Sequence, residues 1–359
     1  MPLPTAYVIA LKHPEELSVK IVQILLDGGL KVNDFPNILT EAAHTGRPKV
    51  AELLLKYGAI INNFAFLKSI AMGYLDLTNL FLEYGTDLNY GDGLCKPLEI
   101  ACRYGHYEIV LSLIKHGASI NQRNISDESF LIDACRGGDV RIVSLLLDKG
   151  LSANDGRLLI TACYEDDEDN QIVDILLEAG ADVNNSSEYF SPLSTAIKHA
   201  SIKTINKLLE RGADIHYKNC NDENILMSLC GNCSCRDRYE MVDILIEKGV
   251  NIDARDCENR TAIIYAIKEC STNIVRELLK HNPDISIVDN RGRCAIKYAI
   301  KKAYDSDICD ILRMIFEYGK KNNSECLRRL GCLIERMIKH NENGGEIDKA
   351  FDARECFVY

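Results

Sequence analysis

A short unit recurs about ten times along this chain of 359 residues, and it limits the possible folds more than any other feature. Each copy has an apolar pair, two polar residues, a second apolar pair, two further residues and then a glycine, as in residues 109–117. The apolar positions share one face of a helix, and a glycine after the last turn suits a left-handed cap. Such a period predicts a stack of small helical units, not one globular core. The glycine column, with Asn282 standing in once, is Gly29, Gly58, Gly85, Gly117, Gly150, Gly180, Gly212, Gly249 and Gly319.

A second, shorter helix is expected after each glycine, as at residues 97–102, where proline occupies the first turn. A short polar residue four positions past the glycine is expected to begin a turn through local bonds between its side chain and the backbone. Each unit is therefore predicted to be helix, tight turn, helix and extended loop. These turn residues are Asn33, Asn62, Asn89, Asn121, Asn154, Asn184, His216, Asp253 and Ser286.

The pattern resembles the ankyrin repeat over roughly residues 5–320. The segments that carry the resemblance are 96–101, 105–110 and 117–121, with end-of-repeat signatures at 180–184 and 212–215. The resemblance implies an all-α ankyrin-repeat solenoid of helix-turn-helix units with short β-hairpin loops. We expect residues 1–320 to form this array of about ten repeats.

Residues 321–359 are expected to form a C-terminal capping helix and tail. After a polar break at 320–324, the apolar residues between Glu325 and His340 have the spacing of one amphipathic helix. The exposed end of a stack needs such a cover.

The Thr-Pro-Leu-His motif that begins a typical ankyrin repeat is nowhere complete in this chain. Residues 191–194 read Ser-Pro-Leu-Ser, and residues 261–264 read Thr-Ala-Ile-Ile. In the family these polar residues tie neighbouring units by hydrogen bonds, and each lost bond is expected to cost about 1 kcal/mol. We therefore expect an array of uneven stability.

Loop lengths differ along the predicted array. Three loops are short enough to be truncated hairpins: Gly29–Ala42, Gly58–Ala71 and Gly150–Ala162. In the resembling family the hairpin tips and first helices line the concave face, which implies usable grooves at 86–134 and 181–299. Three insertions between the helices of a unit are expected to project from the opposite edge: 165–169, 231–238 and 304–307.

The chain carries a net charge of −11 at neutral pH, which argues against nucleic acid and anionic membranes as main partners. No apolar run of about 18 residues predicts a membrane span. Residues 1–5 lack the pattern of a secretory signal. We therefore expect a cytoplasmic, monomeric protein, or one that acts inside a host cell if it is an effector.

Fifteen cysteines, an odd number, argue against a disulfide framework. Four occupy one repeat position, where cysteine is expected to pack as a small apolar residue: Cys102, Cys135, Cys163 and Cys230. The competing hypothesis is a zinc- or redox-responsive protein that uses the Cys-rich insertion 230–235, with Cys220 and Cys257 nearby. The irregular spacing favours packing.

The sequence has no Gly-x-Ser-x-Gly motif, no phosphate-binding glycine loop and no His-Glu-x-x-His motif. The acidic run 165–169 lacks the alternating ligands of a calcium loop. His106 is expected to bond locally, whereas His13, His44, His199 and His281 have no evident partners. We predict that the protein is not an enzyme and uses no cofactor or metal.

The predicted function is a protein–protein interaction scaffold that binds a partner protein along the concave face. Tyr104, Arg136 and Tyr217 rank first, because tyrosine and arginine dominate the binding energy of many interfaces. Alternatives are a substrate adaptor for a ubiquitin ligase, or a host-directed effector, that uses the C-terminal segment. The full set of candidate contact residues is Arg103, Tyr104, Arg123, Asn124, Arg136, Tyr189, Lys198, His199, Tyr217, Lys218, Arg255, Asp256, Lys268 and Glu269.

Overall fold

The computed structural model describes residues 10–29, 31–35, 37–89, 95–124, 126, 128–164, 170–231, 239–303 and 309–322. Within these ranges the chain is helical and contains no β-strand, only two isolated antiparallel bridges. The all-α prediction is therefore confirmed. The predicted capping helix and tail lie outside the described residues.

The chain divides into two compact units. Unit 1 comprises Met1–Ala162 and Gln171–Ala181, and unit 2 comprises Cys163–Asn170 and Asp182–Tyr359. The helices of unit 1 are α2 (Glu15–Asp27), the 3-10 helix η1 (Val32–Asp34), α3 (Ile38–His44), α4 (Pro48–Lys56), α5 (Asn63–Ala71), α6 (Leu75–Glu83), α7 (Pro97–Arg103), α8 (Tyr107–Lys115), α9 (Phe130–Gly137), α10 (Val140–Asp148), α11 (Leu158–Ala162) and α12 (Gln171–Glu178). Those of unit 2 are α13 (Pro192–His199), α14 (Ile202–Glu210), α15 (Ile225–Cys230), α16 (Glu240–Glu247), α17 (Ala262–Lys268), α18 (Thr272–Lys280), α19 (Ala295–Ala303) and α20 (Cys309–Lys321).

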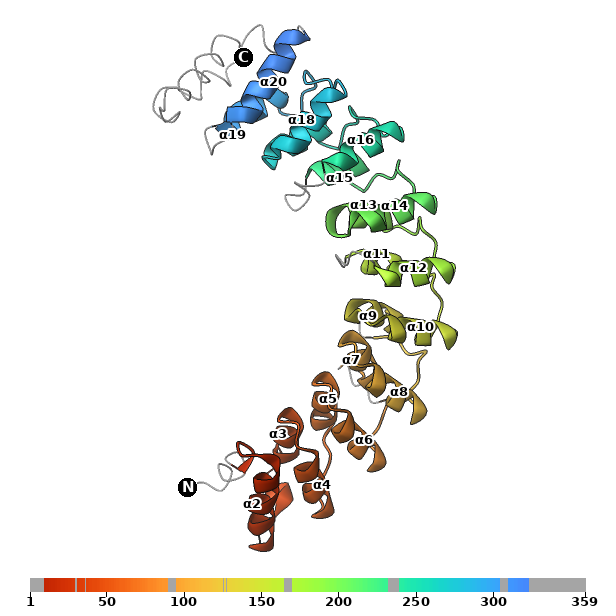
Figure 1. Cartoon of the computed structure of the whole chain (residues 1–359), viewed down its shortest axis with the longest axis vertical. Coiled ribbons are helices and arrows are strands. Elements are labelled where there is room, and N and C mark those ends of the chain that lie inside the picture. The colour runs from red at the N-terminus through yellow and green to blue at the C-terminus, as the bar shows by residue number, and fades with distance from the viewer. Residues whose placement is uncertain are drawn as a thin grey trace, which may run out of the picture. The chain divides into compact units, whose positions relative to one another are not determined.

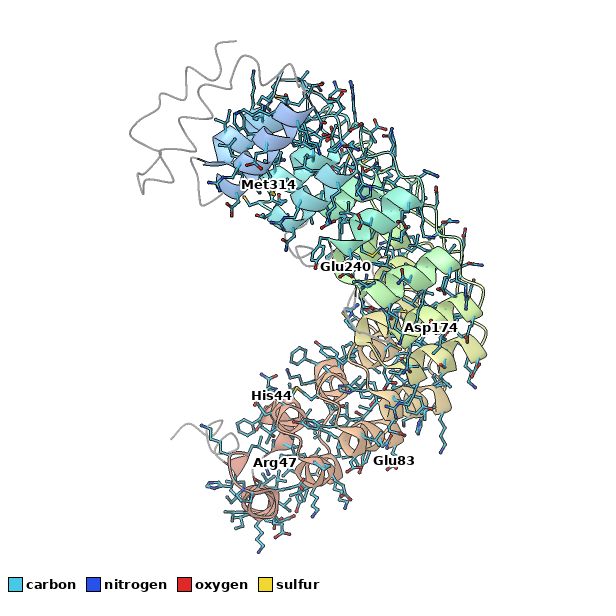
Figure 2. The ribbon with its side chains drawn as sticks, turned by 45° about the horizontal axis from the view of Figure 1, so that its top comes forward. His44, Arg47, Glu83, Asp174, Glu240 and Met314 are labelled. Carbon is cyan, nitrogen blue, oxygen red and sulfur yellow. The ribbon has the colours of Figure 1, made fainter. Side chains whose placement is uncertain are left out.

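From α3 onwards the helices form antiparallel pairs, each with an odd-numbered first helix and an even-numbered second helix (Figure 1). Within a unit, consecutive first helices pack side by side, as α3, α5, α7, α9 and α11 do, and most second helices do the same. The turns inside pairs and the loops between pairs lie on opposite sides. His44 at the end of α3 and Glu83 at the end of α6 mark these two sides in unit 1 (Figure 2). The described residues hold nine such pairs and α2, so the count of ten repeats stays a prediction.

The glycine column ends the second helices as predicted. Its first eight members have φ between 79° and 95°, and Asn282, the substitute, has φ of 54°. The apolar positions before these residues form the core; Val110 and Leu113, for example, are fully buried. Gly319 is different, because α20 continues through it to Lys321. The Lys320 ammonium lies 4.4 Å from the centre of the Phe316 ring, and the Asn322 amide donates to the Tyr318 carbonyl, so helical bonding extends past the glycine.

The polar residue four positions past each glycine was expected to bond locally, and in four places it bonds to the next pair instead. Asn33 Nδ2 donates to the Gly58 carbonyl at 2.9 Å, and Asn184 Oδ1 accepts from the Asp214 amide at 2.7 Å. Asn89 and Asp253 accept from the equivalent amides of Ser119 and Asp284. The local turn is made by the residue two positions earlier, such as Asp182, which accepts from the Asn184 amide. This column therefore joins consecutive pairs.

The missing family motif leaves polar groups without partners in two of the helix starts. The hydroxyls of Ser129 and Thr261 are buried and have no hydrogen-bond partner among the described residues. Ser191 instead forms a reciprocal pair with Ser194: each hydroxyl accepts from the backbone amide of the other residue, at 3.1 and 2.8 Å. Serine at the histidine position can therefore complete the bond, whereas isoleucine cannot.

No helix in the described part of the chain is both long enough and apolar enough to cross a membrane.

Candidate partner-binding surface

The loop before a first helix has the same pair of internal hydrogen bonds in four places, and we call each such loop a finger. In the fingers 124–128, 219–223, 256–260 and 289–293, the first side chain is Asn or Asp. Its Oδ1 atom accepts hydrogen bonds from the amides two and four residues later, at 2.7 to 3.0 Å. Two fingers close with a single bridge, Arg123 to Ser129 and Lys218 to Asn224, so the expected β-hairpins are reduced to one bridge each.

Two of the predicted contact residues are the first residues of fingers, and the structure corrects their role. Asn124 is 7% exposed and Asp256 is 4% exposed. Their side chains bond to their own loops, and little of either reaches the surface. We therefore assign Asn124 and Asp256 to holding the fingers and remove them from the contact set.

Three arginines and three acids from α7, α9 and the neighbouring loops meet in unit 1, and we call this group the arginine cluster. Arg103 lies 2.6 Å from Glu99 and 2.8 Å from Asp133. Arg136 binds Glu128 with two nitrogens, at 2.8 and 3.2 Å, and Arg157 binds the same carboxylate at 2.9 Å. Asn124 Nδ2 donates to both Glu128 and Asp133.

The acids and the arginines of this cluster differ in exposure. The side chains of Glu99, Asp133 and Glu128 are at most 6% exposed, whereas those of Arg103, Arg136 and Arg157 are 37%, 40% and 60% exposed. The hydrogen bond from Arg136 lowers the pKa of Glu128. Burial raises the pKa of Asp133 despite its bond to Arg103. The cluster therefore has a carboxylate interior and a guanidinium surface.

Two fingers of unit 2 pair Asp with Arg inside the loop and add a tyrosine. Arg293 Nη2 lies 2.7 Å from Asp289, and the Tyr298 hydroxyl donates to the same carboxylate at 2.7 Å. Burial, and then the bond to Asp289, raises the pKa of Tyr298 to about 12.

The other finger of this kind connects to its neighbour. The Tyr265 oxygen lies 2.8 Å from Asp256 and 2.7 Å from Glu223 of the preceding finger, and Arg260 pairs with Asp256 at 2.6 Å. Burial and these two carboxylates raise the pKa of Tyr265. Tyr265 and Tyr298 are therefore neutral hydrogen-bond donors.

An aromatic group gathers at α13 in unit 2. The rings of Tyr164 and His199 are 4.7 Å apart, and the Phe190 ring lies 6.5 Å from Tyr164 and 6.4 Å from Tyr189. The Lys198 ammonium lies 5.7 Å from the centre of Phe190. The structure thus brings together three predicted contact residues, Tyr189, Lys198 and His199.

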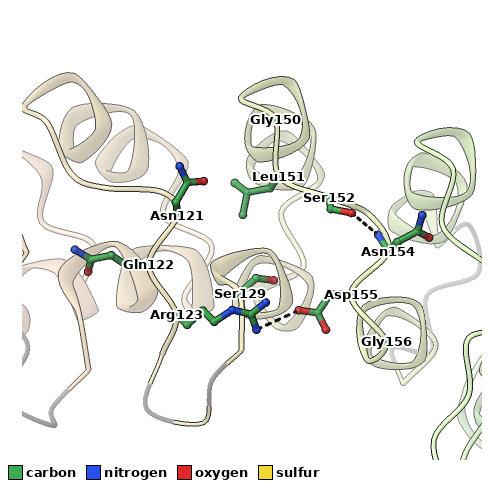
Figure 3. Close-up of a pocket in the computed structure, with 10 residues that line it drawn as sticks. All are labelled: Asn121, Gln122, Arg123, Ser129, Gly150, Leu151, Ser152, Asn154, Asp155 and Gly156. Atoms are coloured by element: carbon green, nitrogen blue, oxygen red, sulfur yellow. Dashed lines mark hydrogen bonds and ion pairs between the residues drawn. The ribbon is translucent and has the colours of Figure 1, made fainter.

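A polar pocket of about 480 Å³ lies in unit 1 at the shortened loop that follows Gly150. Figure 3 shows Arg123 and Asp155 facing each other at this pocket, 3.9 Å apart. A second pocket of about 280 Å³ lies at the shortened loop after Gly58. Both pockets therefore lie beside a loop that the sequence predicted to be truncated.

The sequence matches the model of ankyrin repeats in three copies, at residues 98–187, 131–219 and 232–326, which together span more than half of the chain. The chain belongs to the ankyrin-repeat family. Members of this family are generally non-enzymatic modules for protein–protein interaction.

Known proteins share this array at moderate identity. An ankyrin repeat protein of fowlpox virus is 26% identical over 205 residues, which cover 55% of this chain and 52% of the viral protein. A transient receptor potential cation channel subfamily A member 1 homologue of Caenorhabditis elegans is 30% identical over 195 residues, 51% of this chain and 15% of the channel. The ankyrin repeat and KH domain-containing protein mask-1 of the same organism is 33% identical over 231 residues, 60% of this chain and 8% of that protein. The chain thus spans about half or less of the length of these relatives.

The other predicted contact residues of this ankyrin array are either exposed or half-buried. Tyr104 is 59% exposed, with its ring stacked 6.2 Å from His106, and Arg123 and Arg255 are also exposed. Tyr217 is half-buried and donates to the Ser187 carbonyl at 2.9 Å. The Lys268 ammonium lies 5.6 Å from the centre of the Tyr265 ring. Lys218 is exposed, and Glu269 is half-buried.

The His106 side chain bonds to the preceding helix pair, although a local bond was expected. Its Nε2 atom lies 3.3 Å from the Ala71 carbonyl of the preceding first helix. The His106 ring also explains Gly73, which has φ of 74°: a Cβ atom there would lie 2.8 Å from the ring. His281, expected to have no evident partner, pairs with Asp243 at 2.6 Å.

The cysteine column packs as predicted, since Cys102, Cys135, Cys163 and Cys230 are fully buried. Burial raises the pKa of the Cys135 thiol to about 12, so this thiol stays protonated. Cys233, Cys235 and the acidic run 165–169 lie outside the described residues. Among the described residues, no three His, Cys, Asp or Glu side chains are grouped to hold a metal ion.

Sequence reasoning missed Glu128, Arg157, Tyr164 and Tyr265. One signal was available for the fingers. Asn124 and Glu128, Asn219 and Glu223, Asp256 and Arg260, and Asp289 and Arg293 are all four residues apart and precede a first helix. No comparable local pattern marks Arg157, whose partner Glu128 is 29 residues away.

Proposed function

We propose that this ankyrin array binds a partner protein along the surface formed by its first helices and fingers, which we call the first-helix face. Ankyrin repeats are protein-interaction scaffolds, and the identity of the face is our proposal. The observation that carries it is the fixed arginine cluster, in which exposed guanidinium groups are held by buried carboxylates. Side chains fixed before binding lose little conformational entropy when a partner docks.

Exposed aromatic side chains next to first helices also support the proposal. Tyr104 follows α7, and Tyr189 precedes α13 beside Phe190 and Lys198. Tyrosine and arginine supply large contact areas with few torsions to restrict, which is why they are frequent energetic centres of interfaces. Unit 1 and unit 2 each present such a group.

Site-specific photocrosslinking tests the choice of face. Tyr104 is replaced by p-benzoylphenylalanine, and Tyr57, an exposed tyrosine that follows the second helix α4, receives the same replacement as the matched control. In a lysate of the source organism, we expect position 104 to give a discrete crosslinked protein that excess unmodified protein competes away. Crosslinking of the same protein from position 57 alone, or equally from both positions, would contradict the proposed face.

A further inference from the structure

Charge is segregated between the two kinds of helix. The first helices carry eight Lys or Arg residues and three acids, Glu41, Glu99 and Asp133, although the whole chain has a net charge of −11. Two of those three acids, Glu99 and Asp133, are fully buried. The second helices α4 to α20 carry eleven basic and fourteen acidic residues. The first helices are therefore basic in a protein that is otherwise acidic.

In unit 1 basic groups reach the surface through the arginine cluster. Its formal charge is balanced, but the carboxylates lie inside and the guanidinium groups lie outside. An approaching molecule meets N–H donors first. Arg157 uses Nη1 for its bond to Glu128, and its Nε and Nη2 atoms have no partner among the described residues. These two atoms form one edge of a guanidinium group, the edge geometry that binds a carboxylate with two hydrogen bonds.

We propose that the arginine cluster binds an acidic segment of a partner protein, whose aspartate or glutamate carboxylates pair with the outer nitrogens of Arg103, Arg136 and Arg157. This inference rests on the proposed function and names the chemistry of the partner at that site. The buried acids fix the arginines in place, so the array presents a rigid set of donors. The exposed Arg123, at the adjoining polar pocket, extends the basic surface.

A carboxylate segment fits better than a nucleic acid. The overall negative charge of the chain repels a long phosphate backbone, whereas a short acidic peptide interacts mainly with the local cluster. The binding should therefore be local, dependent on single arginines and weakened by salt.

The test uses Arg157→Gln, with Arg141→Gln as the matched control. Arg141 is 63% exposed and pairs with one acid, Asp139, beside the second helix α10. Arg157 is 60% exposed and also pairs with one acid, Glu128. Glu128 keeps its bonds to Arg136 and Asn124 after the substitution. Arg103 and Arg136 are left intact because their loss would strand buried carboxylates. Thermal melts check that both variants fold, and Arg157→Lys tests whether restored charge rescues binding.

The probes are fluorescein-labelled peptides of alternating glutamate and serine, the matching glutamine and serine peptide, a phosphoserine peptide and single-stranded oligothymidine. We expect the full chain to bind the glutamate peptide in fluorescence anisotropy, and the glutamine peptide not to bind. Arg157→Gln should weaken binding about fivefold or more, while Arg141→Gln should not change it. Arg157→Lys should keep more of the affinity than Arg157→Gln.

Absence of glutamate-peptide binding, or equal loss in the two glutamine variants, would overturn the inference. Tighter Arg157-dependent binding of the phosphoserine peptide or of oligothymidine would also overturn it, in favour of a phosphorylated protein or a nucleic acid. If position 104 still crosslinks a partner in any of these cases, the proposed function stands and only the acidic chemistry fails. If position 104 gives no crosslink while the glutamate peptide binds, the peptide site exists but the proposed face for the natural partner is wrong.

Discussion

The finger 124–128 of unit 1 and the finger 289–293 of unit 2 share the same pair of internal hydrogen bonds but arrange their charges differently. In both, the first side chain accepts two amides of the loop. In unit 1 a neutral Asn comes first and Glu128 comes last, whereas in unit 2 Asp289 comes first and Arg293 comes last. The loop therefore requires only an oxygen at its first position, and the last position is free to vary.

The residue at that last position decides whether the charge of the finger is balanced within the finger or by residues outside it. Arg293 satisfies Asp289 within the same loop, and Tyr298 completes the group. Glu128 has no basic residue in its own finger, and so Arg136 from α9 and Arg157 from the next loop supply the balance. In the finger 289–293 the negative charge of Asp289 is balanced by Arg293 of the same finger. In the finger 124–128 the negative charge of Glu128 is balanced by exposed arginines outside the finger. The basic surface of unit 1 is a consequence.

The largest expected effect comes from breaking the recruited network. Arg103→Ala removes the closest partner of both Glu99 and Asp133, which remain buried. A buried carboxylate without its partner is costly, so we expect a loss of about 3 kcal/mol in the free energy of unfolding. Arg141→Ala is the control, because Arg141 is 63% exposed and Asp139 keeps its bond from the Arg141 backbone amide, so stability should change little. Urea titration followed by circular dichroism measures both; similar losses would show that burial of the acids does not matter.

Exchanging the first residues of the two fingers, Asn124→Asp in one variant and Asp289→Asn in another, should lower the free energy of unfolding by a smaller amount. The two losses should depend on pH in opposite directions. Asn124→Asp places a carboxylate where the amide nitrogen now lies, 3.1 Å from Glu128 and 3.2 Å from Asp133. Repulsion and burial should raise the pKa of the new Asp, with a loss of about 2 kcal/mol at neutral pH. Because a raised acid pKa destabilises the fold only when the group is ionised, acidification should reduce this loss.

Asp289→Asn should show the reverse trend. Burial alone would raise the pKa of Asp289, but the bonds from Arg293 and Tyr298 outweigh it and lower the pKa to about 2 from an ordinary 3.8. The lowered pKa contributes about 2 kcal/mol to the free energy of unfolding at pH values above the ordinary pKa. This contribution is lost as the pH falls towards 2. The variant should therefore lose that amount at neutral pH and approach the parent below about pH 4. Urea titrations of both variants from neutral to acidic pH test the pair, and parallel pH trends would refute the charge comparison.

The parts that the sequence predicted are those that depend on short-range periodicity. The apolar columns, the left-handed glycines and the buried cysteines all follow from residues within one helix and its cap. One register was misjudged at a truncated loop. The Tyr74 amide bonds to the Ser69 carbonyl, as the His106 amide does to Ala101, so Ser69 and not Ala71 occupies the small-residue position of α5.

The parts that could not be predicted depend on which side chains meet across pairs. Nothing local to Asn89 shows that its oxygen accepts from Ser119, or that Glu128 pairs with Arg157. Asn124 and Asp256 looked variable and polar, and therefore exposed, but a finger buries its first residue. Exposure of a polar residue in a repeat depends on loop geometry, which period and composition do not encode.

The smallest expected effect concerns the helix start that follows each kind of finger, where a buried hydroxyl occurs in both. Ser129 follows the Asn-Glu finger and Thr261 follows an Asp-Arg finger, and both hydroxyls are buried without a hydrogen-bond partner among the described residues. Ser129→Ala and Thr261→Val remove these groups with little change in shape, so each should raise the unfolding free energy by about 1 kcal/mol. Ser191→Ala, which breaks the reciprocal pair with Ser194, should lower it by a similar amount. Because the gain comes from the helix start and not from finger charge, it should be equal in the two settings and independent of pH. A gain at only one of them would mean that finger charge also controls the adjoining helix start.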